Sequence, residues 1–136
     1  MSVSADLLRD IPFLRGLDDR AIEEVASSMR ERRVPAGQEV VRQGESGVGF
    51  FIVLDGEAEV GIDGQTRRTL GPGDHFGEIA LVARDSPRTA TVTARTDLQL
   101  AGMTPWVFKP LAFKHPEVMW ALLETLAQRV SETPGR

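Results

Sequence analysis

The sequence predicts an α+β domain built on an antiparallel β-barrel or jelly roll, with helices before and after it. Apolar residues recur at helical spacing near both ends of the chain and alternate with polar residues in its middle. Glycine-containing turns divide this middle region into short segments about every 8–12 residues, as in antiparallel sandwiches and barrels. The pattern therefore disfavours strand-helix-strand units and a parallel sheet.

The composition is that of one globular domain, residues 1–136, with 41% hydrophobic and 26% charged residues. Cysteine is absent, which excludes thiolate metal sites and cysteine nucleophiles, and two histidines, His75 and His115, are too few for a histidine-rich metal centre. A net charge of −4 provides no attraction to nucleic acid or to an anionic membrane. With no secretory signal and no membrane-length apolar run, we expect a cytoplasmic protein without metal, cofactor or catalytic residues.

The first zone, residues 1–34, is predicted to be helical. Asp18 is a suitable N-cap for a helix whose apolar residues recur at positions i, i+3, i+4 and i+7. Pro35 and Gly37 then end the helical zone. The apolar positions that should face the core are Ile22, Val25, Ala26 and Met29.

The second zone, residues 35–103, is predicted to form the β-barrel. An apolar run at 50–54 and alternating residues at 58–62, 89–95 and 98–100 indicate strands. Aspartate-glycine pairs between such segments are strong signals for two-residue hairpins. The predicted turns are Asp55-Gly56, Asp63-Gly64 and Gly71-Pro72-Gly73.

The third zone, residues 104–133, is predicted to be helical again. Thr104 is an N-cap followed by Pro105 at the first helical position, and Pro110 should kink or interrupt the helix because it lacks a backbone donor. A new helix begins at Pro116, and we expect Trp120 to pack on it rather than to cover a ligand. Its predicted apolar stripe is Met119, Leu122, Leu123, Leu126 and Val130.

A short apolar segment at 78–82 interrupts the β region and carries the chemistry of the chain. The backbone N–H groups from Gly77 to Ala80, at the start of a helix, would attract an anion, and glycine allows close approach. Arg88 offers a guanidinium fork to phosphate oxygens, and Glu78 can accept a hydrogen bond from a ribose hydroxyl. Alternatively Glu78 is only a first-turn acid and Arg88 pairs with it or with Asp85. Without further information this second interpretation has the better support, since most charged rim residues are solvated.

The same segment resembles the phosphate-binding cassette of cyclic nucleotide-binding domains, found in catabolite-activator-type regulators, cyclic nucleotide-dependent kinases and gated channels. Phe-Gly-Glu-Ile-Ala-Leu at 76–81 and Arg-Thr-Ala-Thr-Val at 88–92 occur in the order and spacing of that family. Segments 42–45, 50–56 and 70–74 are similar to its barrel turns, and 105–130 to its hinge and C-terminal helix. The resemblance thus covers nearly the whole chain.

The resemblance implies a role for each matching residue. Glu78 would bind the ribose 2′-hydroxyl and Arg88 the cyclic phosphate. Val60 would pack on the base, although a plain core position is equally consistent with its place in a strand. Thr89 would contact a guanine amino group, or else be an ordinary β-branched strand residue. The backbone amides that would line the phosphate belong to Gly77, Ile79, Ala80 and Thr89.

The implied function is a regulatory module that binds a cyclic nucleotide, cAMP rather than cGMP, and changes the position of its C-terminal helices. An effector domain or partner protein would read that change, and a homodimer is left open. One alternative is a degenerate member of the same fold that binds no ligand and serves as an interaction surface. A second is a cupin-like metal enzyme, which would need clustered histidines. His75, next to Asp74, is expected to be a rim histidine.

Overall fold

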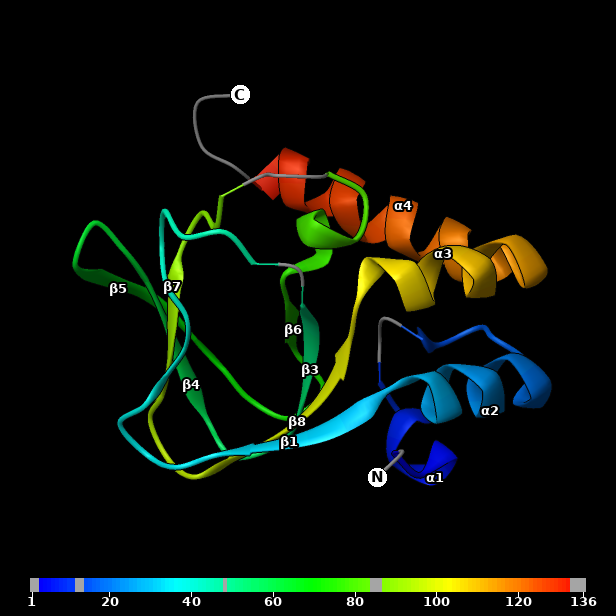
Figure 1. Cartoon of the computed structure of the whole chain (residues 1–136), viewed down its shortest axis with the longest axis horizontal. Helices are drawn as coiled ribbons and strands as arrows, with labels where there is room; N and C mark the ends of the chain where they lie inside the picture. The colour runs from blue at the N-terminus through cyan, green and yellow to red at the C-terminus, as the bar shows by residue number, and fades with distance from the viewer. Residues whose placement is uncertain (1–2, 12–13, 48, 84–86, 133–136) are drawn as a thin grey trace.

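The computed structural model describes residues 3–11, 14–47, 49–83 and 87–132, with side chains as far as Arg129. Its helices gather on one side of two antiparallel sheets (Figure 1), which confirms the predicted fold class. The elements in chain order are α1 (Ala5–Leu8), α2 (Asp19–Ser28), β1 (Arg30–Val34), β2 (Glu39–Val41), β3 (Phe50–Asp55), β4 (Ala58–Ile62), β5 (Gln65–Leu70), β6 (His75–Phe76), the 3₁₀-helix η2 (Glu78–Leu81), β7 (Thr91–Ala94), β8 (Leu98–Met103), α3 (Pro105–Lys114) and α4 (Pro116–Glu132).

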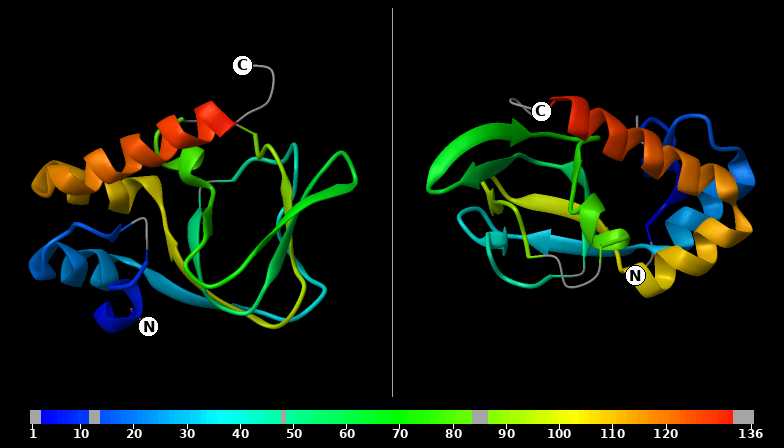
Figure 2. Two further views of the ribbon diagram at one scale, coloured as in Figure 1. Left: turned by 180° about the vertical axis from the view of Figure 1, so that it is seen from behind. Right: turned by 90° about the horizontal axis from the view of Figure 1, so that it is seen from above.

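Each sheet has four strands, in the orders β1-β8-β3-β6 and β2-β7-β4-β5, and every pairing is antiparallel. Both views in Figure 2 show α4 running from the helical side toward the strands, so that its C-terminal end lies close to them. A hydrogen bond of 3.0 Å from Arg129 Nη2 to the His75 carbonyl joins that end to β6. No helix in the described ranges is long and apolar enough to cross a membrane.

Two aspartate-glycine turns with the same sequence signal have different outcomes. Asp63 and Gly64, with φ of 54° and 80°, join β4 to β5 as the predicted hairpin, with Ile62 opposite Gln65. The hairpin prediction at Asp55-Gly56 is wrong, because β3 pairs with β8 and β6, whereas β4 pairs with β7 and β5. That turn carries the chain from one sheet to the other. The dipeptide specifies the local bend. The strand partners depend instead on the place of β3 in the middle of its sheet, between β8 and β6.

The helical zones also differ from prediction at their edges. The N-terminal helical zone stops at Ser28, because residues 30–34 form β1 and pair with β8. Four of these five residues are Arg or Glu, which conceals the alternation of this edge strand. Helix α3 continues through Pro110, an exposed residue, so the predicted interruption of the helix does not occur. Thr104 is the N-cap of α3 as predicted, but its hydroxyl makes no cap hydrogen bond.

The apolar residues form two clusters, one beneath the helices and one between the sheets. The helical cluster contains all four residues predicted for this face, Ile22, Val25 and Ala26 of α2 and its C-cap Met29, together with Leu81 of η2. Helix α4 contributes Val118 and Leu122, so Trp120, about 200° around the helix from each, is 63% exposed. Its predicted packing role is therefore wrong. Of the predicted stripe, Leu122 is buried, Leu126 partly buried, Met119 and Leu123 exposed, and the Val130 side chain lies outside those described.

Candidate functional site

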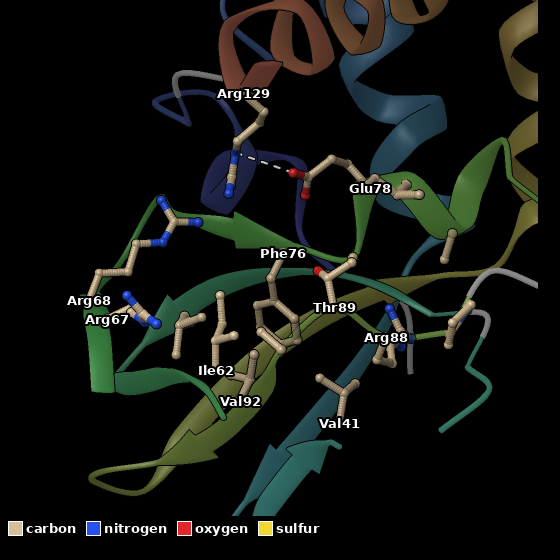
Figure 3. A pocket seen from close by; sticks show the side chains of 16 residues that line it. Val41, Ile62, Arg67, Arg68, Phe76, Glu78, Arg88, Thr89, Val92 and Arg129 are labelled. Atoms are coloured by element: carbon tan, nitrogen blue, oxygen red, sulfur yellow. Dashed lines mark ion pairs between the residues drawn. The ribbon is translucent and has the colours of Figure 1, made fainter. Parts of the chain in front are cut away.

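A cavity of about 640 Å³ opens between the sheet β2-β7-β4-β5 and the segment around η2 (Figure 3). All seven residues predicted from the sequence for the site line it. Its floor is apolar, and arginines and one glutamate stand around it. The floor residues are Val41, Val60, Ile62, Phe76 and Val92, and the charged residues are Arg67, Arg68, Glu78, Arg88 and Arg129.

The predicted anion-binding turn is shorter than expected, a single 3₁₀ turn over Glu78–Leu81 in place of a helix over 78–82. Gly77 precedes it with φ of 85°. A Cβ on Gly77 would lie 2.5 Å from the Gly49 carbonyl and 2.8 Å from Arg88 Nη1, so only glycine fits here. The Ala80 N–H donates to the Gly77 carbonyl at 3.0 Å. That amide is therefore engaged within the turn, contrary to the prediction of a free donor.

Arg88 is a half-buried guanidinium at the wall of the cavity. Its Nη2 donates to the Gly49 carbonyl at 2.8 Å, and its buried Nε has no hydrogen-bond partner in the described part of the chain. Among the described residues Arg88 has no ion pair, so the alternative pairing with Glu78 is absent, while Asp85 lies outside those residues. Burial lowers the pKa of Arg88 from its usual value. A desolvated positive charge with an unused donor is suited to an anionic ligand.

Glu78 is only 5% exposed and both of its carboxylate oxygens already have partners. Oε1 lies 3.2 Å from Arg129 Nε, and Oε2 lies 3.4 Å from His75 Nδ1. Burial by itself would raise the pKa of Glu78, but the hydrogen bond with His75 and the charge of Arg129 outweigh it and hold the pKa below its usual value. Glu78 is thus an ionised hydrogen-bond acceptor, and both of its oxygens are engaged by protein groups in this structure.

Arg129 lines the cavity as well, although it is not among the residues predicted for the site. Its place in the sequence indicates only a favourable positive charge near the C-terminal end of a helix, which is a common feature of exposed helices. The fold brings it across from α4 to Glu78, and Figure 3 shows this ion pair on one side of the cavity and Arg88 on another. No local pattern indicates a contact between residues so far apart in the chain. His75, expected at the rim, is instead partly buried beside Glu78, its side chain 14% exposed.

The remaining predicted residues, Val60, Ile79 and Thr89, also line the cavity but differ in their exposure. Val60 is 8% exposed and stands opposite Val92 and Arg68 in the sheet, so it belongs to the core and to the cavity wall at once. Ile79 is 43% exposed at the cavity. Thr89 is exposed and precedes β7, so its alternative interpretation as a strand residue is wrong.

The chain is similar in sequence to known proteins. The family model of the cyclic nucleotide-binding domain matches residues 31–115. A cyclic nucleotide-gated potassium channel of Rhizobium etli is 33% identical over 128 residues, covering 94% of this chain and 36% of the channel. A cAMP-dependent protein kinase regulatory subunit of Yarrowia lipolytica is 41% identical over 96 residues, covering 69% of this chain and 25% of the subunit.

The fold is also similar to solved structures. The catabolite activator protein of Thermus thermophilus superposes with a TM-score of 0.83 and 28% identity, over 89% of this chain and 59% of that protein. The chain spans about a quarter to a third of the length of the curated relatives it matches. These similarities confirm the resemblance seen in residues 76–92, and the chain belongs to the cyclic nucleotide-binding domain family.

Proposed function

We propose that this chain binds one cyclic nucleotide, cAMP in preference to cGMP, and transmits binding through movement of α4. The observation that carries the proposal is the guanidinium of Arg88, which is half-buried at the cavity and whose Nε has no partner among the described residues. No carboxylate of those residues pairs with it, and a charge held away from water in this way is costly for the fold alone. A cyclic phosphate, with one negative charge and free oxygens, would provide the missing partner.

The cavity offers three chemically different surfaces for the three parts of the ligand. The phosphate is assigned to Arg88 and the turn at Gly77, since donors and positive charge meet there. The ribose is assigned to the ionised carboxylate of Glu78. The base is assigned to the apolar floor formed by β4 and β7, where Val60 and Val92 lie side by side.

The preference for cAMP rests on that apolar floor, which offers no hydrogen-bond partners to the polar groups of guanine. Similarity to the regulatory subunit of a cAMP-dependent kinase supports it. Thr89 is the residue that would favour guanine, because its exposed hydroxyl lines the cavity.

Movement of α4 follows from an exchange of partners at Glu78. A ribose hydroxyl that binds this carboxylate competes with Arg129, whose Nε now lies 3.2 Å from Oε1. When Arg129 gives up that contact, the C-terminal end of α4 loses one of its attachments to the cavity. A ligand acts on such an equilibrium only through its different affinity for the two arrangements, and Glu78 supplies that difference. The change would be read by an effector domain or partner protein in the cytoplasm.

Calorimetric titration with cAMP and with cGMP tests ligand binding directly. The protein is first unfolded and refolded to remove nucleotide carried over from the expression host. We expect binding of both nucleotides at one site, with cAMP tighter. The absence of heat and of any thermal shift at millimolar nucleotide would overturn the proposal and favour a non-binding interaction domain.

The movement of α4 has a separate test, made simple because the chain has no native cysteine. Spin labels at Ala127→Cys on α4 and Thr69→Cys on β5, both exposed positions, report the distance between the helix and the sheet. We expect cAMP to shift the distance distribution. The same pair with Arg88→Ala should not respond. An unchanged distance in a protein shown to bind cAMP would refute the movement while leaving binding intact.

A further inference from the structure

The guanidinium of Arg88 lies against the backbone at Gly47, in space that any larger side chain would fill. A Cβ on Gly47 would stand 2.9 Å from Nη2 and 3.0 Å from Cζ of Arg88, and closer still to Nε. Real Cβ atoms essentially never approach other heavy atoms within 3.0 Å. The methyl group would therefore collide with two nitrogens of the same charged group and lie tight against Cζ; one of the two nitrogens is the Nε that has no hydrogen-bond partner among the described residues.

The backbone around Gly47 is held to the backbone around Arg88. The Gly44 N–H donates to the Arg88 carbonyl at 2.8 Å, and the Arg88 N–H donates to the Glu45 carbonyl at 3.0 Å. Ser46 and Pro87 form an antiparallel bridge between the same two segments. These contacts join the two segments. Moving the segments apart to relieve a clash at Gly47 would therefore break the hydrogen bonds between them. The flexible end of the Arg88 side chain moves instead.

We propose that Gly47 is a positioning residue for Arg88: the absence of a side chain at this position sets where the guanidinium stands in the cavity wall. The inference rests on the proposed function, in which Arg88 binds the cyclic phosphate. Gly47 is distinct from Gly77, whose φ of 85° and approach to a backbone carbonyl require glycine for the fold itself. The backbone of Gly47 has no left-handed φ, so alanine is compatible with it and only the guanidinium is displaced.

The test is calorimetric titration of cAMP into Gly47→Ala, with Gly71→Ala as the matched control. Gly71 also lacks a left-handed φ, and a Cβ there would meet no atom within 4 Å. We expect Gly47→Ala to weaken binding about tenfold or more. The displaced Arg88 guanidinium would stay in the site but lose its aligned hydrogen bonds to the phosphate. Gly71→Ala should bind as the unmodified protein does. Both variants should keep the urea midpoint of the unmodified protein.

A second pair of variants separates positioning from a general disturbance of the loop. In an Arg88→Lys background the guanidinium is gone, so adding Gly47→Ala should change the remaining affinity by less than about threefold. The Arg88 Nε–Hε resonance of the unliganded protein, assigned by its loss in Arg88→Lys, should shift in Gly47→Ala and stay in place in Gly71→Ala. This second readout does not depend on any ligand.

The outcomes are distinct. If the unmodified protein does not bind cyclic nucleotide, the proposed function falls and the inference falls with it. If the protein binds but Gly47→Ala binds equally well, or if the Arg88 resonance does not move, the inference alone is wrong. An equal loss from Gly47→Ala with Arg88 present and in the Arg88→Lys background would also overturn it, because the methyl group would then act without the guanidinium.

Discussion

Replacing Arg88 with alanine should weaken cyclic nucleotide binding more than replacing Glu78 with alanine. Arg88 is half-buried, and no carboxylate of the described residues neutralises it, so it supplies its full charge to the phosphate. Truncating one member of a desolvated, hydrogen-bonded charge pair costs about 2–5 kcal/mol. At about 1.4 kcal/mol for each tenfold change, the dissociation constant should rise about 30-fold to several thousandfold.

The loss at Glu78 is limited by the contacts that this residue already makes. A hydrogen bond to a charged acceptor is worth about 1.5–3 kcal/mol. The ribose must first displace the Arg129 or His75 contact, at 3.2 and 3.4 Å from the carboxylate, and that displacement reduces the gain. We therefore expect the loss of binding free energy in Glu78→Ala to lie at or below about 1.5 kcal/mol, which is about a tenfold rise in the dissociation constant.

The assay is calorimetry on ligand-free protein, with Arg67→Ala as control. Arg67 also lines the cavity but is exposed, so its removal subtracts one positive charge without a desolvated contact. Exposed charge pairs contribute about 0–1 kcal/mol, and the control should change affinity by less than about fivefold. Urea unfolding of each variant verifies that the fold is retained. Equal losses in the Arg88 and Glu78 variants, or a larger loss at Glu78, would show that the roles are misassigned.

Three further predictions concern selectivity, acid stability and one turn. If the Thr89 hydroxyl contacts the guanine amino group, Thr89→Ala should lower cGMP affinity by about 0.5–1.5 kcal/mol and leave cAMP nearly unchanged in parallel titrations; equal changes would refute the contact. Because the pKa of Glu78 is lower in the fold, its stabilisation is present above the ordinary carboxyl pKa and is lost as pH falls through the folded value. Urea unfolding from pH 7 to pH 3 should show a smaller acid loss for Glu78→Gln, and an identical loss would contradict this. Gly56→Ala should destabilise the protein more than Gly64→Ala: both have positive φ, costing about 1–2 kcal/mol, but only at Gly56 would the methyl group collide with the Asp97 carbonyl. Equal unfolding midpoints would contradict that difference.

The sequence predicted what depends on local pattern and missed what depends on the placement of distant segments. The cap at Asp18 and the hairpin at Asp63-Gly64 involve neighbouring residues, and both occur as predicted. The turn at Asp55-Gly56 carries the same local signal, yet its flanking strands join different sheets because β3 finds partners on both edges. Arg129 was not predicted for the same reason, since its contact with Glu78 exists only once α4 has packed against α3 and η2.

The sequence also does not determine which side chains of α4 are buried. Periodicity identified a helix, but the buried side is chosen by the neighbouring elements, and it runs through Val118 and Leu122. Trp120 was therefore assigned to the wrong side. The residues predicted at 77–80 and 88–89 line one cavity, and the family resemblance behind that prediction carries long-range information that composition and spacing lack.

The 3₁₀-helix η2 contributes residues both to the cavity and to the apolar cluster beneath the helices. Its first residues line the cavity, while Leu81 is 6% exposed within the apolar cluster beneath the helices. Because η2 is a single turn of four residues, a shift of Leu81 in the apolar cluster also moves the residues of η2 that line the cavity. Helices α3 and α4 both contact η2. Under the proposed function, substitutions that change how α3 or α4 packs against η2 should therefore alter nucleotide affinity, while every residue that lines the cavity stays the same.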